Sequence, residues 1–224
     1  MGNLYLVRHG QASLGAPDYD QLSPLGVQQS QRLGAYFADK GIRFEAVLTG
    51  TLRRHLQTYA GICTGGGTQM DALPWPGLNE FDGEAVIRAI HPQPLPRPSH
   101  ADPEAFRQHF RLLRDGLTQW MNGVVSPQGM PSYQDFRHGV VSALDHIRQQ
   151  YSGNVLVVSS GGPIATAVGH ILGTTPETTI ELNLRIRNTA VTECVFSPKR
   201  HTLQTFNGIP HLEHADYAGW VTAA

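Results

Sequence analysis

Short apolar runs alternate along this chain with longer stretches in which apolar residues recur at helical spacing. Three of the runs have the length and composition of buried strands, and each is followed by a segment of helical pattern. The strand-like runs lie at 3–7, 44–49 and 154–159, and the helical segments at 24–40, at 52–63 and from about 164. This alternation predicts an α/β fold, a three-layer α/β/α arrangement with helices on both faces of a mostly parallel sheet.

Capping and turn residues set the ends of two predicted helices. Ser23 is suited to the N-cap of the first helix, with Pro24 at its first position and Gly41 just beyond its end. Ser132 and Asp135 have the spacing of a capping box before a later helix. Further strands are expected at 69–73, 190–196 and 202–206, the last two as a hairpin.

The segment from about residue 84 to residue 130 follows neither pattern closely. A proline-rich stretch at 92–98 precedes an amphipathic helix at 103–121, and a loop rich in glycine and proline follows. We expect a lid-like insertion in a single domain that spans residues 1–224. Its cationic side chains are expected on a solvated face; they are Arg88, His91 and Arg97.

Composition and charge limit the classes of partner. With 224 residues, of which 40% are hydrophobic and 16% charged, the chain can bury one sizeable core. The formal net charge of -1 and the pI near 6.8 provide no polycationic field for nucleic acid and no basic surface for a membrane. We therefore expect a small-molecule partner.

The two cysteines, Cys63 and Cys194, lie far apart and without CxxC spacing. We expect free, buried thiols and no metal site, which fits a reducing compartment. No run approaches the roughly 18 apolar residues of a membrane span, and the first residues lack the pattern of a signal peptide. A cytoplasmic location is expected.

Three polar clusters fall at or just after the ends of predicted strands. They are Arg8-His9-Gly10, Arg53-Arg54 and Ser160-Gly161-Gly162. Because the carboxyl ends of parallel strands meet at one edge of a sheet, these turns can converge on one crevice. An imidazole between guanidinium groups, near a glycine-rich helix start, forms a pocket suited to a phosphoryl group.

Each cluster also has an ordinary explanation. His9 could be a satisfied histidine in a turn, and Arg53 and Arg54 could be solvated residues in the first turn of a helix. A cation at a helix N-terminus opposes the helix dipole, however, so an arginine there needs a reason other than helix stability. Ser160 could cap the next helix, a role that is compatible with phosphate binding.

Together, five motifs resemble those of the histidine phosphatase superfamily, the phosphoglycerate-mutase-like proteins. They are Leu6-Val7-Arg8-His9-Gly10, Leu22-Ser23-Pro24-Leu25-Gly26 with Gln29, Leu52-Arg53-Arg54 with Gln57-Thr58, Leu78-Asn79-Glu80, and Val157-Val158-Ser159-Ser160-Gly161-Gly162. The resemblance spans most of the chain outside the insertion. It implies a phosphoglycerate-mutase-like fold and a reaction that needs no cofactor.

The resemblance also implies roles for individual residues. His9 is the implied nucleophile that forms a phosphohistidine, while Arg8 and Arg54 hold the phosphoryl oxygens as charge builds in the transition state. Glu80 is the implied acid that protonates the leaving oxygen and later activates water. Spacing alone does not separate Glu80 from Asp82, and Glu84 is a more distant alternative.

Two places depart from the family pattern. Ser160 stands where the resemblance implies a second histidine, and losing a charged donor of that kind costs on the order of 10²–10³ in rate. In the first loop, Gln11 and Ser13 stand where the family often has a small hydroxyl and an asparagine. The residues expected to contact the substrate are Gly10, Gln11, Ser13, Ser160 and Gly161.

Another histidine could approach the pocket in place of the missing one. The candidates are His55, His138, His170 and His201. We expect each of them at the surface or in a cap.

Two functions from different classes fit these residues. The first is a phosphomonoesterase that acts on a small phosphorylated metabolite through phospho-His9. The second, motivated by Ser160, is a protein that binds phosphate in the same pocket without turnover. A phosphoglycerate-type mutase comes last, because nothing in the chain favours it.

Overall fold

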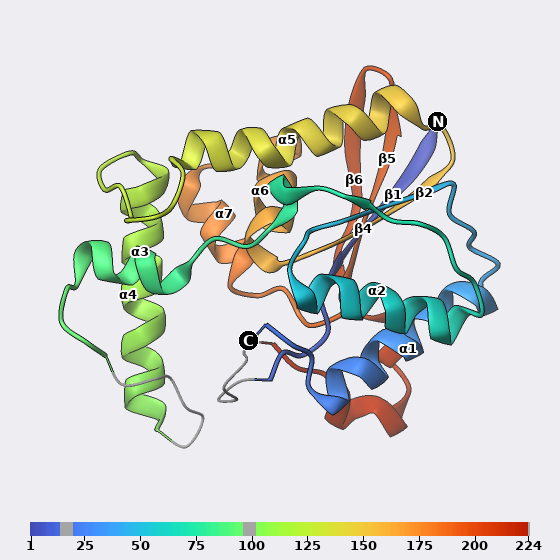
Figure 1. Ribbon diagram of the computed structural model, residues 1–224, viewed down its shortest axis with the longest axis horizontal. Helices are drawn as coiled ribbons and strands as arrows, with labels where there is room; N and C mark the ends of the chain where they lie inside the picture. The colour runs from blue at the N-terminus through green and yellow to red at the C-terminus, as the bar shows by residue number, and fades with distance from the viewer. Residues whose placement is uncertain (14–19, 96–101, 224) are drawn as a thin grey trace.

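A six-stranded sheet forms the centre of the molecule (Figure 1). The computed structural model describes residues 1–13, 20–95 and 102–223. The strands are β1 (Gly2–Arg8), β2 (Ala46–Thr49), β3 (Leu73–Pro74), β4 (Asn154–Ser159), β5 (Val191–Ser197) and β6 (Arg200–Gly208). Their order is β3-β2-β4-β1-β5-β6, in which the first four strands are parallel, β5 is antiparallel to β1 and β6 is antiparallel to β5. The predicted mostly parallel sheet is confirmed.

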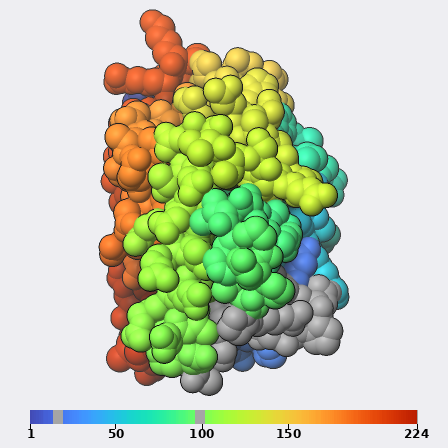
Figure 2. Space-filling model, turned by 90° about the vertical axis from the view of Figure 1, so that its left-hand side faces the viewer, coloured from blue at the N-terminus to red at the C-terminus, as the bar shows by residue number. Residues whose placement is uncertain are grey.

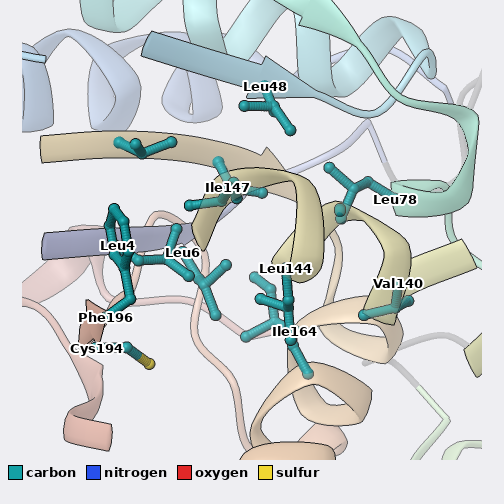
Figure 3. Close-up of a cluster of buried hydrophobic side chains, with 14 of the residues drawn as sticks. Leu4, Leu6, Leu48, Leu78, Val140, Leu144, Ile147, Ile164, Cys194 and Phe196 are labelled. Atoms are coloured by element: carbon teal, nitrogen blue, oxygen red, sulfur yellow. The ribbon is translucent and has the colours of Figure 1, made fainter. Parts of the chain in front are cut away.

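Helices pack on both faces of this sheet. On one face lie α1 (Pro24–Asp39) and α2 (Arg53–Gly66), and on the other lie α5 (Tyr133–Gln150) and α6 (Gly161–Leu172). The other α-helices of the described residues are α3 (Gly83–Ile90), α4 (Pro103–Met121) and α7 (Pro176–Asn183). Because successive strand residues point to opposite faces, Tyr5 of β1 packs with Phe37 of α1. Leu6 packs on the other face with Ile147 of α5 and Ile164 of α6 (Figure 3). The three-layer arrangement is confirmed.

The predicted capping residues begin their helices. The Ser23 hydroxyl accepts a hydrogen bond from the Gly26 N–H at 3.0 Å, at the start of α1. The Ser132 hydroxyl accepts one from the Asp135 N–H at 3.1 Å, at the start of α5. Each serine thus satisfies one N–H group that its helix leaves without a partner in the first turn.

Other element boundaries differ from the prediction. Helix α6 begins at Gly161, three residues before its predicted start, because the two glycines already adopt helical conformation ahead of Pro163. Strand β3 has only two residues, at the end of the stretch where a longer strand was expected. Helices α3 and α7, of eight residues each, were not predicted, and α3 lies in the segment that was expected to follow no clear pattern.

A third hydrophobic cluster lies away from the sheet, around Trp120 of α4. It joins Trp120 to Val86 of α3, Ile180 of α7 and Phe81 in the loop before α3. Figure 2 shows α3 and α4 side by side on one face of the molecule. Helices α3 and α4 therefore pack on one another, on α7 and against Phe81.

Both cysteines are free, and only one of them is fully buried. Cys194 belongs to the core, whereas Cys63 near the end of α2 is half-buried. The prediction of a buried thiol is confirmed for Cys194 and holds only in part for Cys63. Across the described residues, no helix has both the length and the apolar character needed to cross a membrane.

Candidate active site

The carboxyl ends of β1, β2 and β4 bring the three predicted clusters together. His9 follows β1 directly, and its N–H donates to the Ser159 carbonyl at 2.8 Å, while the Gly50 N–H after β2 donates to the Val158 carbonyl at 3.1 Å. The Ser159 hydroxyl donates to the Leu78 carbonyl at 2.7 Å. This last bond ties the loop that carries Glu80 to the same edge of the sheet.

His9 is 4% exposed, and a backbone contact determines which ring nitrogen can react. Its Nδ1 lies 2.7 Å from the Gly10 carbonyl. Because a carbonyl only accepts, Nδ1 carries the hydrogen and Nε2 keeps its lone pair. Burial lowers the pKa of His9 well below its ordinary value of 6.5, and the charges of Arg8 and Arg54 lower it further. The ring is therefore neutral near pH 7, with a nucleophilic Nε2.

Two buried arginines supply positive charge beside His9. Arg8 and Arg54 are each 8% exposed. Arg8 donates from Nη1 to the Ile186 carbonyl, and Arg54 pairs through Nη1 with Asp20 at 2.6 Å. Arg53, by contrast, is exposed on the first turn of α2. The two buried guanidinium groups can hold an anion with several oxygens.

Glu80 lies at the N-terminus of α6. Its Oε2 accepts from the Gly162 N–H at 3.1 Å, and its Oε1 accepts from the Phe81 N–H at 3.2 Å. Burial raises the pKa of Glu80 above 4.5, although the Gly162 N–H and the charges of Arg54 and Arg8 oppose the rise. A carboxyl with a raised pKa, close to both arginines, can act as a general acid.

The alternative carboxyl, Asp82, has another partner. It accepts from the Ala85 N–H at 3.0 Å as the N-cap of α3 and pairs with Arg88 at 3.7 Å. Glu84 is exposed and also faces Arg88. The geometry thus favours Glu80 over Asp82 and Glu84.

Side chains from α1 and α2 hold the loop after β1. The Gly10 N–H donates to the Thr58 hydroxyl at 3.0 Å, and that hydroxyl donates to the Arg54 carbonyl at 2.7 Å. The Gln11 N–H donates to Oε1 of Gln29 at 2.8 Å. Since Thr58 and Gln29 are fully buried, the backbone that presents His9 is rigidly supported.

Gln11 and Ser13 are tied back toward the start of α1. Oε1 of Gln11 accepts from the Ser23 hydroxyl at 2.7 Å, and the Ser13 N–H donates to the Gln21 carbonyl at 2.8 Å. Both residues are half-buried. Both residues therefore make hydrogen bonds within the protein, and their expected contact with substrate stays a prediction.

Ser160 occupies the predicted N-cap position of α6, but its side chain makes no capping hydrogen bond. Its Oγ lies 2.7 Å from Nε2 of His55, and both residues are fully buried. The predicted capping bond is therefore wrong. Gly161 packs closely against Asn183, and it is the next residue, Gly162, whose N–H faces the Glu80 carboxylate.

The expectation that His55 lies at the surface or in a cap is also wrong. The first turn of α2 faces the end of β4, so the ring points into the protein, with its centroid 5.8 Å from that of His9. His138 and His170 are exposed as expected, and His201 is half-buried.

Arg88 and His91, two cationic residues from the segment at about 84–130, make contacts outside the candidate site. Arg88 is exposed and pairs with Asp82 and Glu84, as expected for a solvated face. Nδ1 of His91 is 3.1 Å from the Gln93 carbonyl oxygen. Arg97 lies outside the described residues. Within 1–13, 20–95 and 102–223, no group of three or more His, Cys, Asp or Glu side chains is arranged to hold a metal ion.

A family model for the histidine phosphatase superfamily, branch 1, matches residues 4–208. The chain belongs to the histidine phosphatase superfamily. The resemblance noted in its motifs is thereby confirmed at the level of the family. None of the curated proteins matches this chain in sequence.

Solved structures share its fold over nearly the whole chain. A putative α-ribazole-5′-phosphate phosphatase from Escherichia coli has a TM-score of 0.67 and 21% identity, covering 93% of this chain and 97% of its own. A mutant phosphoserine phosphatase from Entamoeba histolytica in complex with phosphoserine has a TM-score of 0.65 and 20% identity, covering 95% and 100%. A mycobacterial glucosyl-3-phosphoglycerate phosphatase has a TM-score of 0.66 and 20% identity, covering 93% and 99%. At these identities the likeness establishes the fold.

Sequence reasoning missed several residues that support the site. Gln29 and Thr58 were part of the quoted motifs, but nothing local indicated that their side chains hold the backbone of the first loop. Asp20, the partner of Arg54, had no signal in the sequence at all. His55 was among the histidines considered for the pocket but was expected at the surface or in a cap. The signal that could have singled it out is its place directly after Arg54.

Proposed function

We propose that this histidine phosphatase is a phosphomonoesterase that acts on a small phosphorylated metabolite through a phosphohistidine at His9. One observation carries the proposal: a buried, neutral imidazole has Nε2 available beside two buried guanidinium groups and a carboxyl with a raised pKa. The similar structures named above are described as a phosphoserine phosphatase, a putative α-ribazole-5′-phosphate phosphatase and a glucosyl-3-phosphoglycerate phosphatase. This supports a small phosphomonoester as the substrate class.

In the first step, Nε2 of His9 attacks phosphorus. The new P–N bond forms as the P–O bond to the leaving group breaks, and Glu80 transfers its proton to the departing oxygen. Arg8 and Arg54 stabilise the charge on the remaining phosphoryl oxygens. Glu80 ends this step as a carboxylate, a form that the Gly162 N–H stabilises.

In the second step, water attacks the phosphohistidine. The Glu80 carboxylate takes a proton from this water, the P–N bond breaks, and inorganic phosphate leaves. His9 returns to its neutral form and Glu80 to its protonated form. The cycle therefore consumes one water and needs no further reactant.

We also propose that the insertion at about 84–130 acts as a lid in a single domain of residues 1–224. Its helix α4 packs through Trp120 on Phe81, with ring centroids 5.7 Å apart. Phe81 directly follows Glu80, so the packing of the insertion bears on the position of the acid. Figure 2 shows the face of the molecule that this segment forms.

A phosphate-binding protein without turnover is the second candidate. The observation that favours it is Ser160, whose hydroxyl offers only a neutral hydrogen bond at the start of α6. The arginines and His9 would bind phosphate equally well in either case.

The experiment is a panel of small phosphomonoesters assayed with the wild type, His9→Ala and His138→Ala. We expect His9→Ala to reduce phosphate release to background, because the nucleophile is gone, while the exposed His138→Ala control stays at the wild-type rate. Labelled substrate quenched with alkali should yield an acid-labile phosphohistidine in the wild type. Turnover that survives in His9→Ala would contradict the mechanism, and binding of phosphate without any turnover would favour the second candidate.

A further inference from the structure

His55 is a buried histidine next to the pocket that the proposed mechanism does not use. It is the third residue of α2 and directly follows Arg54. Its side chain is fully buried, and its ring centroid lies 5.8 Å from that of His9. A polar ring buried this completely needs a specific partner to offset the loss of its contacts with water.

That partner is the Ser160 hydroxyl. Nε2 of His55 lies 2.7 Å from Oγ of Ser160, across 105 positions of sequence. The surrounding backbone leaves room for the ring at Gly50, where any side chain would collide with Nδ1 of His55. The contact thus lies in a space shaped around the imidazole.

Ser160 lies between the groups assigned to the chemistry. Arg8 and Ser159 are paired in the parallel register of β1 and β4, so His9 and Ser160 leave the sheet side by side. Two residues further on, the Gly162 N–H holds Glu80. A phosphoryl group bound at His9 would therefore lie close to the Ser160 hydroxyl.

The proton on His55 can be assigned to Nε2. Burial, and then the charge of Arg54, lower the pKa of His55 to about 3, so the ring is neutral and has a single N–H. Nδ1 has no hydrogen-bond partner among the described residues. A buried N–H without an acceptor is rarer than a buried acceptor without a donor, so the hydrogen belongs on Nε2. Nε2 then donates to Oγ, which leaves the Ser160 O–H free to donate elsewhere.

We propose that His55 is a positioning residue that orients the Ser160 hydroxyl to donate its hydrogen to a phosphoryl oxygen at His9. The inference rests on the proposed function and deepens it. The hydroxyl becomes a directed donor at the start of α6, which adds to the stabilisation by Arg8 and Arg54. The His55–Ser160 pair differs from a nucleophilic serine with its base, because a ring with so low a pKa is a poor base and its Nδ1 faces no carboxylate among the described residues.

The test compares four variants in steady-state kinetics: His55→Leu, His55→Gln, Ser160→Ala and the double variant His55→Leu/Ser160→Ala. Leucine fills much of the same volume without a hydrogen bond, whereas glutamine keeps an N–H donor. We expect His55→Leu and Ser160→Ala each to lower kcat by on the order of 10- to 100-fold with KM little changed. The double variant should lose no more than either single one, because the two residues act as a unit.

The glutamine variant separates positioning from mere support of the fold. His55→Gln should recover most of the kcat that His55→Leu loses, even if the two have the same melting temperature. A wild-type kcat in His55→Leu, multiplied losses in the double variant, or no recovery in His55→Gln would overturn the proposal. So would a labelled phosphoryl group that is acid-stable and attached to Ser160.

Failure of the proposed function gives a different result. A wild type without turnover contradicts the phosphatase mechanism by itself, and the same variants are then compared by their Kd for inorganic phosphate. The inference holds if His55→Leu, Ser160→Ala and the double variant weaken phosphate binding equally and His55→Gln binds more tightly than His55→Leu. It is overturned if His55→Leu binds phosphate as tightly as the wild type.

Discussion

Burial shifts the pKa values of His9 and Glu80 in opposite directions. Loss of water disfavours the charged form of each group, so the pKa of the imidazole falls and the pKa of the carboxyl rises. Both shifts favour the neutral states in which His9 is a nucleophile and Glu80 is an acid. At the residue scale, burial gives both groups the protonation states that the proposed phosphoryl transfer requires.

The pH dependence of kcat/KM should reflect both shifts. Activity on an alkyl phosphate is expected to fall as the pH rises through the pKa of Glu80, which burial moves above 4.5, because the leaving oxygen then lacks its proton. At the acid end it falls as His9 becomes protonated, and the lowered pKa moves that fall well below 6.5. The measurement is kcat/KM against pH for the wild type and Glu80→Gln.

An aryl phosphate provides the control for this prediction, since its leaving group needs little protonation. Glu80→Gln should lower kcat for the alkyl phosphate by about 10²- to 10⁴-fold and for the aryl phosphate by much less. Equal losses on both substrates would show that Glu80 is not the acid.

Helix starts connect local structure to the site at the scale of elements. The N-cap of α1, Ser23, also donates to Gln11 in the loop after His9, so a single hydroxyl begins a helix and holds the pocket. The N-cap of α5, Ser132, has the same capping geometry and also donates to a side chain, that of Asp135. Because the contacts of Ser132 are exposed and lie at the start of α5, Ser132 is a matched control for the capping role of Ser23.

Replacing each of these two serines with alanine should separate the two roles. We expect both Ser23→Ala and Ser132→Ala to lower the free energy of unfolding by about 1 kcal/mol, because each loses an N-cap. Ser23→Ala should in addition raise KM for a phosphomonoester by about 5-fold, since the loop loses one hydrogen bond. Urea unfolding and steady-state kinetics provide the two readouts. An unchanged KM in Ser23→Ala would show that the bond to Gln11 does not matter for binding.

The whole molecule divides its apolar packing between the two faces of the sheet and the cluster around Trp120. The clusters on the sheet hold β1, β2 and β4 in register, and thereby His9, Arg54 and Ser160. The outlying cluster holds Phe81, and thereby Glu80. His9 therefore depends on the sheet clusters, whereas Glu80 depends on the outlying cluster in addition to its connections to the sheet through Leu78 and to α6 through Gly162.

Truncating one residue in each part should show this division. Trp120→Ala and Phe37→Ala remove buried rings, and each should lower the free energy of unfolding by about 3–5 kcal/mol. Under conditions where both variants remain folded by circular dichroism, Trp120→Ala should lose kcat and Phe37→Ala should keep it. Phe37 contacts β1 at Tyr5, whereas the backbone at His9 and Gly10 is also held by hydrogen bonds to Ser159 and Thr58, which Phe37→Ala leaves in place. The same kcat in both variants would contradict a separate role for the outlying cluster.

Local signals in the sequence were sufficient for most of the elements. Strand runs, the capping serines and the helix at 103–121 depend on neighbouring residues only, and the structure has them at or close to the predicted positions. The family also follows from the sequence, because Arg8, His9 and Arg54 stand in recognisable motifs at strand ends. The short helices α3 and α7 were missed although local signals existed, because Asp82 and Thr175 cap them. Their packing around Trp120 is a tertiary feature.

The sequence by itself determined the α/β architecture, the membership of the family and the edge of the sheet where His9 and the arginines meet, because each of these depends on periodicity or on short motifs. Only the tertiary structure decided that His55 is buried and bonded to Ser160, since the two residues are 105 positions apart. It alone also decided the available nitrogen of His9 and the raised pKa of Glu80. A hydrogen bond across the fold and the removal of water from a pocket exist only once the chain has packed.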